Sequence, residues 1–421
     1  MTANIPSHCD DWSLSQWLCY LETIHTKEID LGLARIAEVA KRLNIDLSFG
    51  KVITVAGTNG KGTTCAFIEN YLHSQQYNVA VYSSPHIKRF NERLRVNHEE
   101  VNDLPWIRAL KQVEVARSEI SLTYYEYTTL AAFIVIDELK PDYIILEVGL
   151  GGRLDATNII DADVAVLTTV DLDHMAFLGN TREAIGKEKA GIFRRDRPAI
   201  IGELAPPVTV LNHANDISAI VCCRDKDFTL VNDGNVWTWQ NKQQTFSGLI
   251  ATHIPQNNVA TAIATLTQLE VSLSSEAINA CIAVTKVPGR TEMFSAGCDV
   301  MLDVGHNPQA ARYLSTVIKS RSYNKIYAVV GMLADKDSTS TLNEIKDVID
   351  SWYFATPDSP RAAASEALSA VAQDIGIKGN CFDNVTEAFT MAQQDASGND
   401  LILVFGSFFT VAEIRALLLS N

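Results

Sequence analysis

Residues 52–64 read VITVAGTNGKGTT. The run begins with apolar and β-branched residues, which favour a buried strand, and it passes through a turn with Gly57, Gly60 and Gly62 into a helical pattern. In such a turn, glycines let backbone N–H groups face an anion, the helix N-terminus adds positive charge, and Lys61 reaches the outer phosphates. The pattern G-x-x-x-x-G-K-[ST] is not met, because Val55 stands at its first glycine and Gly62 follows the lysine. We expect a phosphate-binding turn; the alternative is a glycine-rich turn without a function.

Short β-branched runs alternate with longer helical stretches on both sides of this turn. The alternation predicts an α/β fold with a parallel sheet covered by helices, whose βα junctions open at one edge. The expected strands are 51–56, 78–82, 143–148, 164–170 and 198–201. The expected helices follow Gly60 and cover 127–139 and 181–190.

Two domains are expected from the length of 421 residues. Residues 219–254 predict a small antiparallel addition to the first domain, around the turn Asn232-Asp233-Gly234. Helical patterns at 258–269 and 275–284 follow, and turn residues 286–290 then break the periodicity. We therefore expect a first domain at 1–290 and a smaller, Rossmann-like α/β domain at 291–421. Its expected strands are 300–304, 325–330, 351–355 and 401–405.

The bulk composition limits the possible partners. A net charge of −15 disfavours a nucleic-acid surface. The start MTANIPSHCDDW carries acids where a signal peptide carries bases, and there is no run of 18 apolar residues. We expect a cytoplasmic monomer with small-molecule substrates and neither nucleic-acid nor membrane partners. The cysteines form no C-x-x-C pair and are expected to be reduced packing residues: Cys9, Cys19, Cys65, Cys222, Cys223, Cys281, Cys298 and Cys381.

A second motif follows the expected strand 143–148. Glu147 ends an apolar run and precedes residues 149–158, GLGGRLDATN. A carboxylate at this edge could hold magnesium bound to a nucleotide, although a strand-end glutamate is also a common surface or capping residue. Arg153 and the glycines suit close approach to an anionic ligand.

His174 and Lys189 belong to a third set of polar residues. His174 follows the strand 164–170 in the run Asp171-Leu-Asp173-His174, and Lys189 lies near the end of the next helix. Histidine can bind magnesium where carboxylates fix the geometry, but it is more often a hydrogen-bonded structural residue. Lys189 on its own reads as a charge at a helix C-terminus.

A run of cations lies early in the chain, at Lys88, Arg89, Arg93 and Arg95. Such a run could meet an anionic small molecule. We interpret it as a solvated loop.

Together these motifs resemble the folylpolyglutamate synthases, relatives of the Mur ligases of cell-wall synthesis. The similarity runs in order from about residue 20 to the C-terminus. It rests on 57–63, 82–86, 147–158, 173–174, 188–192, 288–290, 303–308, 331–337 and 406–408.

The resemblance implies a set of nucleotide and metal residues. Thr58, Asn59, Gly60, Lys61, Gly62 and Thr63 look like the ATP phosphate turn, and Asn258, Arg290 and Asp303 look like further ATP contacts. Ser84, Glu147 and His174 look like ligands of two magnesium ions. Lys189 matches a family lysine that is carbamylated beside the second metal. Because Arg290 and Asp303 come from the linker and the second domain, closure of a cleft would complete the site.

Three further segments are similar to the dihydropteroate-contacting segments of bifunctional bacterial members. They are Thr23, Ile24, His25 and Thr26; Thr123, Tyr124, Tyr125 and Glu126; and Leu154, Asp155 and Ala156. Without the resemblance, Tyr124 and Tyr125 read as core aromatics at the start of a helix.

The implied reaction joins L-glutamate to a folate-type carboxylate with ATP, through an acyl phosphate. A monovalent cation is a possible further cofactor. The rival readings are a monofunctional folylpolyglutamate synthase, a Mur ligase acting on a muropeptide, and a nucleotide-binding protein without catalysis. Gly62 and the block 151–158 favour the folate branch, and the joint presence of Lys61, Glu147, His174, Lys189 and Arg290 disfavours the non-catalytic reading.

Overall fold

The computed structural model describes residues 11–27 and 29–420. Contacts divide the chain into two compact units. One contains residues up to Val170 together with Leu178–Thr285, and the other contains Asp171–Phe177 together with the residues from Lys286 onward. The division thus falls five residues before the boundary expected at Arg290, and a short segment of the expected first domain belongs to the second unit. Cys9 lies outside the described residues.

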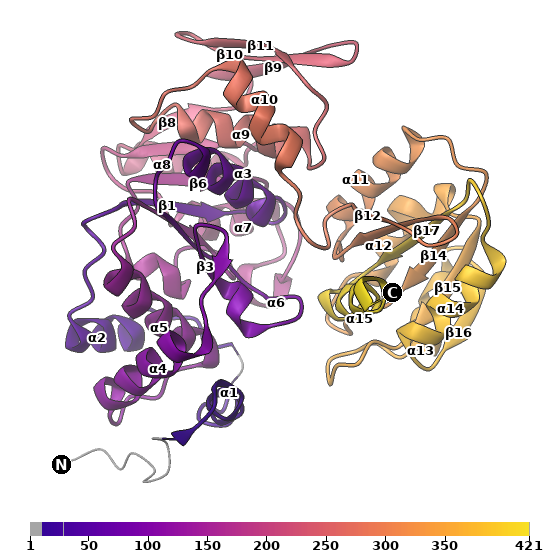
Figure 1. Cartoon of the computed structure of the whole chain (residues 1–421), viewed down its shortest axis with the longest axis horizontal. Helices are drawn as coiled ribbons and strands as arrows, with labels where there is room; N and C mark the ends of the chain where they lie inside the picture. Colours follow the sequence, from indigo (N-terminus) through magenta and orange to yellow (C-terminus); the bar gives the residue numbers. More distant parts are fainter. Residues whose placement is uncertain (1–10, 28, 421) are drawn as a thin grey trace. The chain divides into compact units, whose positions relative to one another are not determined.

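A predominantly parallel sheet forms the centre of the first unit (Figure 1), with the described strands in the order β4-β3-β2-β5-β1-β6-β7-β8. The strands are β1 (Lys51–Ala56), β2 (Val79–Tyr82), β3 (Leu94–Val96), β4 (Glu99–Glu100), β5 (Tyr143–Glu147), β6 (Val164–Leu167), β7 (Pro198–Ile201) and β8 (Ile220–Cys223). Those from β2 to β8 in this order run parallel, and β3 and β4 add an antiparallel edge. Every residue of β1 after Lys51 is buried, as expected for a strand covered on both faces.

The helices of this unit are α1 (Leu14–Leu21), α2 (Ala34–Leu43), α3 (Lys61–Ser74), α4 (Asp103–Arg117), α5 (Tyr124–Leu139), α7 (Arg182–Ala190), α8 (Val208–Asp216), α9 (Gln256–Leu266) and α10 (Ser275–Val284). The short helix α6 (Met175–Leu178) spans the division between the units, and the 3-10 helices η2 (Phe90–Arg93) and η3 (Ala156–Ile159) lie in loops. Helices α1, α2, α4 and α5 share one core with alternate residues of β2 and β5. Helix α3 packs against α9 and α10.

The antiparallel addition consists of β9 (Phe228–Asp233), β10 (Val236–Asn241) and β11 (Thr245–Leu249), which lie side by side in Figure 1. The prediction for residues 219–254 is corrected in one respect. Residues 220–223 are not part of this addition; they form β8, which pairs in parallel with β7 at the edge of the main sheet. Their apolar side chains and this parallel partner account for the difference, because strand propensity alone does not specify which sheet a strand joins.

The second unit has helices on both faces of its own sheet. Its described strands follow the order β12-β13-β17-β14-β15-β16, and β12 is antiparallel to β13. They are β12 (Glu292–Ser295), β13 (Asp299–Asp303), β14 (Ile326–Val330), β15 (Ser351–Ala355), β16 (Gly379–Phe382) and β17 (Leu401–Phe405). The helices are α11 (Pro308–Lys319), α12 (Ser338–Ile345), α13 (Ser365–Asp374), α14 (Val385–Asp395) and α15 (Phe408–Ser420), with the 3-10 helix η4 (Lys346–Val348).

Strand β17 shows how the two cores of this unit arise. Leu401, Leu403 and Phe405 pack into the core beneath α11, α12 and α13, whereas Ile402 and Val404 pack into the core beneath α14 and α15. Alternate residues of a strand point to opposite faces, so a continuous apolar run suits a strand covered on both sides. The predicted α/β class with two α/β units is confirmed.

Candidate active site

The glycine-rich turn joins β1 to α3. Gly60 lies at the N-terminal end of α3 with a φ of 87°, a left-handed conformation that favours glycine. A Cβ on Gly60 would lie 2.6 Å from Oδ1 of Asn258, so a side chain is excluded here by contact as well. The first N–H groups of an α-helix have no acceptor within the helix, and the turn therefore presents donors and positive charge at the start of α3.

Two threonines after β6 brace this turn. The backbone N–H of Thr58 donates to Thr169 O over 2.9 Å, and the N–H of Asn59 donates to Thr169 Oγ1 over 3.0 Å. The Thr168 hydroxyl donates to Asn59 O over 2.6 Å. Neither threonine was predicted as a site residue from the sequence. The sequence does show a Thr-Thr pair directly after an expected strand. The structure shows that this strand, β6, lies next to β1 in the sheet.

Lys61 folds over the turn that it follows. Its Nζ donates to the carbonyl oxygens of Gly57, at 2.9 Å, and Thr58, at 3.3 Å. The ammonium is thus held at the turn and adds a full positive charge to the fixed backbone donors.

Asn258, on α9, contacts the start of α3 beside the glycine-rich turn. Its Nδ2 donates to Thr63 Oγ1 over 2.7 Å, and the Thr63 hydroxyl donates to Gly60 O over 3.0 Å. The structure therefore brings together Asn258 and the turn, which sequence analysis connected only through the family resemblance.

Glu147 lies next to the first turn of α3. Strand β5 pairs in parallel with β1, so that Glu147 is opposite Val55. The residue is 7% exposed, and a Cβ on Gly62 would lie 3.7 Å from both of its carboxylate oxygens. A buried carboxylate is thus placed beside the phosphate-type turn.

Ser84 follows β2 and approaches the loop after Glu147. A Cβ on Gly149 would lie 3.2 Å from Ser84 Oγ and 2.9 Å from Tyr125 Oη. The structure therefore brings Ser84 and Tyr125 to the segment that begins two residues after Glu147. Burial raises the pKa of Tyr125 well above its ordinary value, so its hydroxyl stays neutral at physiological pH.

Lys189, on α7, is 5% exposed and packs against the other end of this loop. A Cβ on Gly152 would lie 2.7 Å from Lys189 O, and the N–H of Arg153 donates to Glu188 O over 2.8 Å. Arg153 Nη2 also forms an ion pair with Glu188 at 2.9 Å. The last turn of α7 and residues 152–153 thus form one packed element.

Residues 123–126, one of the segments similar to dihydropteroate-contacting segments, form a helix cap. Glu126 Oε2 accepts from the N–H of Thr123 over 2.8 Å, and Thr123 Oγ1 accepts from the N–H of Glu126 over 3.2 Å. This capping box starts α5 and fixes the first turn that carries Tyr124 and Tyr125. Arg93 lies over the Tyr124 ring at 5.5 Å, and burial raises the pKa of Tyr124 to about 12.

Asp155 organises the loop between β5 and η3. Its Oδ2 accepts from the N–H groups of Gly149 and Leu150, and its Oδ1 accepts from the N–H and hydroxyl of Thr157. Burial raises the pKa of Asp155 in spite of these donors. Leu154 and Ala156 flank this carboxylate in the chain, and Ala156 is buried.

The first dihydropteroate-type segment is the loop after α1. The Thr23 hydroxyl donates to Tyr20 O over 2.8 Å, and Ile24 packs against the core beneath α1 and α5. His25 Nε2 lies 3.7 Å from Asp30 Oδ2, while Thr26 is exposed.

His174 lies in the second unit, whereas Ser84, Glu147 and Lys189 lie in the first. Its Nε2 is 3.4 Å from Lys336 Nζ, which forms an ion pair with Asp173 at 2.9 Å. Burial disfavours the Asp173 carboxylate, but His306, Lys336 and His174 outweigh it and hold the pKa of Asp173 well below its ordinary value. The neighbours of this carboxylate therefore favour its ionised form.

Arg290 and Asp303 are close together in the second unit. Asp303 accepts from the N–H groups of Thr291, at 2.8 Å, and Gly305, at 2.7 Å. Burial raises the pKa of Asp303, and the nearby Arg290 opposes that rise. The Arg290 guanidinium lies 5.2 Å from the centre of the Phe408 ring.

Two family models match the chain, namely the Mur ligase middle domain at residues 55–265 and the Mur ligase, glutamate ligase domain at residues 289–408. The dihydrofolate synthase/folylpolyglutamate synthase of Escherichia coli is 45% identical over 402 residues, which cover 95% of this chain and 94% of that one. The chain belongs to this family of Mur ligases.

Solved structures of the family match the whole fold. The structure of Escherichia coli FolC in complex with DHPP and ADP has a TM-score of 0.94 at 43% identity, over 97% of this chain and 98% of that one. A bifunctional folylpolyglutamate synthase/dihydrofolate synthase with Mn, AMPPNP and L-glutamate bound has a TM-score of 0.91 at 42% identity, with the same coverage. The expected Mur-ligase type of fold is thereby confirmed.

The interpretation of the early basic run as a solvated loop is wrong for two of its members. Arg93 is buried and donates from Nε to His86 Nδ1 over 3.0 Å, and Arg95 Nη2 forms an ion pair with the buried Glu69 at 2.8 Å. Glu69 lies on α3, and the Tyr124 ring beneath Arg93 lies on α5, so local charge density does not reveal these partners. Lys88 and Arg89 are exposed, as expected.

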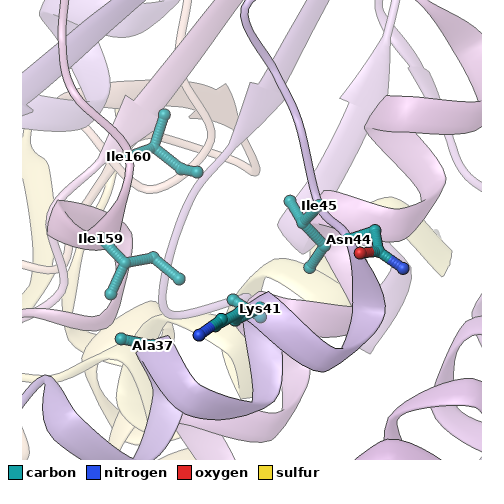
Figure 2. A pocket seen from close by; sticks show the side chains of 7 residues that line it. Ala37, Lys41, Asn44, Ile45, Ile159 and Ile160 are labelled. Atoms are coloured by element: carbon teal, nitrogen blue, oxygen red, sulfur yellow. The ribbon is translucent and has the colours of Figure 1, made fainter.

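A cavity of about 410 Å³ has none of the residues assigned to the family site in its lining (Figure 2). It lies between α2 and the end of η3 and is lined by Ala37, Ala40, Lys41, Asn44, Ile45, Ile159 and Ile160. In Figure 2, Ile159 and Ile160 face α2 across the cavity. Its lining lacks the acidic and glycine-rich features of the site around Glu147.

Proposed function

We propose that the protein is an ATP-dependent ligase that adds L-glutamate to dihydropteroate, giving dihydrofolate, and to reduced folates, giving folylpolyglutamates. One observation carries the proposal: the buried Glu147 carboxylate stands beside the glycine-rich turn of α3, in a chain that matches the family over both of its domains. The turn suits a phosphate chain, and the carboxylate suits a divalent cation.

The donor set supports ATP and a divalent cation as cofactors. Within the first unit, Glu147 and Ser84 offer carboxylate and hydroxyl oxygens, which are the ligands that Mg²⁺ prefers. Among residues 11–27 and 29–420, no three His, Cys, Asp or Glu side chains gather tightly enough to hold a metal. A cation here would therefore take other ligands from phosphates and water, as Mg²⁺ commonly does. Relatives were solved with ADP and with AMPPNP and Mn. We assign two Mg²⁺ ions to this chain, with His174 as a further ligand, and a monovalent cation as an optional addition.

The reaction needs an activated acyl group, because a carboxylate does not condense with an amine in water at a useful rate. A carboxylate oxygen of the pterin substrate attacks the γ-phosphorus of ATP, which breaks the bond to ADP and gives an acyl phosphate. The α-amino group of glutamate attacks the acyl carbon, loses a proton and displaces phosphate. Lys61 and Arg290 neutralise charge on the phosphoryl group, and a bound Mg²⁺ ion supplies further electrostatic stabilisation.

Lys189 is assigned as a carbamate. The residue is buried, and its backbone packs against Gly152 in the loop that joins Glu147 to Asp155. A carbamate on its side chain would offer a negative oxygen ligand to a cation. An unmodified ammonium near two divalent cations would be repelled.

Asn258 and Asp303 keep their assignment as ATP contacts, and the second unit contributes to glutamate binding.

The proposal includes a monomeric enzyme in the cytoplasm. The cysteines of the described residues form no disulfide, which suits a reducing compartment. None of the described helices combines the length and the apolar character that a membrane crossing requires.

The test measures ADP and phosphate release that depends on glutamate, in parallel with dihydropteroate and with tetrahydrofolate, and identifies products by mass. Both substrates should gain glutamyl residues. Turnover of tetrahydrofolate without any dihydrofolate from dihydropteroate would leave a monofunctional folylpolyglutamate synthase. Turnover of a nucleotide-linked muropeptide alone would point to a cell-wall Mur ligase, and nucleotide binding without product would favour the non-catalytic reading.

A further inference from the structure

One side chain joins Asp30, in the loop that also contains the substrate segment 23–26, to Glu126 in the substrate segment 123–126. Arg35, in the first turn of α2, donates from Nη1 to Asp30 Oδ2 over 2.6 Å and from Nη2 to Asp30 O over 2.7 Å. The same Nη2 donates to Glu126 Oε1 over 3.1 Å, although Arg35 and Glu126 are 91 residues apart in the chain. A single guanidinium thus bonds both to the loop after α1 and to the first turn of α5.

The Asp30 carboxylate lies close to several side chains of the loop. Besides Arg35, Lys27 lies 3.4 Å from Oδ1 and His25 lies 3.7 Å from Oδ2. Burial opposes the ionised form, but Arg35 and Lys27 outweigh it and lower the pKa of Asp30. Asp30 is therefore a carboxylate at neutral pH, and of these three neighbours the Arg35 guanidinium is the closest to it.

Glu126 is the partner of Arg35 on α5, and its side chain is 6% exposed. Its other oxygen caps the helix through the N–H of Thr123. Loss of Arg35 would leave a buried carboxylate without this cation, which is costly. The turn most affected carries Tyr124 and Tyr125, the aromatic residues of the substrate segment.

Helix α2 does not need Arg35 in order to stay attached. Ile36 and Val39 are fully buried in the core shared with α4 and α5. The apolar face of α2 therefore holds the helix, and the ion pairs of Arg35 join the loop to the α5 turn.

We propose that Arg35 is a positioning residue for the pterin end of the substrate. It fixes the spacing between the loop that contains residues 23–26 and the turn that contains residues 123–126, and it acts through Asp30 and Glu126. The inference rests on the proposed function, because that function assigns both segments to the substrate. The phosphate turn and Asn258 are not among the hydrogen-bond partners of Arg35, so ATP binding should be independent of it.

The test compares steady-state kinetics of Arg35→Gln, Arg35→Lys and Arg42→Gln. Arg42 is a matched control: it lies on the same helix and bridges Glu38 to the end of α4 through the carbonyl of Ala116. Arg35→Gln should raise KM for dihydropteroate about tenfold, the loss expected for charged hydrogen bonds, with kcat and KM for ATP within about twofold. Arg35→Lys should lie between wild type and Arg35→Gln, because an ammonium cannot reproduce the planar fork. Arg42→Gln should leave all three parameters unchanged.

A readout without substrate separates this inference from the proposed function. Amide hydrogen exchange should speed up in residues 23–27 and 123–127 of Arg35→Gln, and not in residues 61–74. If wild type does not use dihydropteroate, the proposed function fails, while the exchange still decides whether Arg35 couples the two segments.

Two results would overturn the inference. One is exchange in the two segments that is the same in Arg35→Gln and wild type. The other is a proportional change in KM for dihydropteroate, KM for ATP and kcat, which indicates general damage. If Arg35→Gln does not fold, the same measurements on Arg35→Lys decide the matter.

Discussion

The side-chain amide of Asn258 donates to the Thr63 hydroxyl over 2.7 Å, and this bond joins α9 to the first turn of α3. The two residues are 195 positions apart in the chain. Helix α9 thus helps to hold the first turn of α3, which directly follows the glycine-rich turn.

Asn258→Ala should raise KM for ATP about tenfold, since a buried hydrogen bond of roughly 1.5 kcal/mol is lost at the turn. Asn279→Ala is the matched control, because the Asn279 amide likewise joins a helix to another segment: it accepts from the N–H of Ile250 and donates to Gly248 O. The control should lose stability and keep its KM for ATP. Equal values of KM in Asn258→Ala and wild type would remove Asn258 from the ATP site.

Lys61→Ala should lower kcat at least about 100-fold while the fold remains intact, because the transferring phosphoryl group loses a positioned cation. The measurement pairs turnover with circular dichroism. Lys51→Ala is the control: Lys51 starts the strand that leads to the turn and is exposed, 3.8 Å from Asp163. Turnover by Lys61→Ala at the wild-type rate would show that the lysine has no phosphate role.

Lys189 should carry a carbamate in the active enzyme. Mass analysis of intact protein under bicarbonate should show the addition of one CO2, and Lys189→Ala should be poorly active. Lys187→Ala, an exposed change on the same helix, should keep both the adduct and the activity. A bare amine in fully active protein would contradict the modification.

Changes in the pterin segments should affect the two activities unequally. Dihydropteroate carries its reacting carboxylate on the benzoate, whereas a folate carries it at the end of a glutamyl tail, so the two substrates must be held differently. Tyr124→Leu and substitutions of Asp155 should therefore alter the ratio of the two turnover rates, and Lys61→Ala should abolish both. A constant ratio across the Tyr124 and Asp155 variants would show that these residues do not distinguish the substrates.

Thiol reactivity should follow burial. Burial raises the pKa of Cys281 to about 12, so at a pH of about 8 almost none of this thiol is the reactive thiolate. Iodoacetamide should label the exposed Cys19 and Cys381 in the native protein and reach Cys281 only after unfolding, as judged by peptide mass. Rapid native labelling of Cys281 would mean that α10 opens readily.

The sequence predicted the central strands closely. The expected ranges 51–56, 198–201, 351–355 and 401–405 coincide with β1, β7, β15 and β17, because continuous apolar runs suit strands that are buried on both faces. Strand β16 was not predicted: it begins with Gly379-Asn380 and is largely exposed, so it has no such run. Strand β3 has three residues, too few to show a period.

The sequence predicted those parts of the candidate site that lie within one continuous segment, namely residues 57–63 and 147–158. The contacts of Thr168 and Thr169 with the turn were not predicted, because they depend on which strand lies beside β1. The partners of Arg93 and Arg95 were missed for a similar reason: Tyr124 and Glu69 come from helices that are distant in the sequence. The roles of the predicted site residues stay predictions until the variants are measured.

The main sheet ends on one side in β4, a strand of two exposed glutamates. An uncovered sheet edge is a template for pairing with another molecule, and the length and charge of the edge strand set how strong that template is. Here a second chain could align with only two residues, and a second copy of the same edge would bring carboxylates against carboxylates. Even in concentrated solution, this border of the sheet is therefore a poor starting point for aggregation.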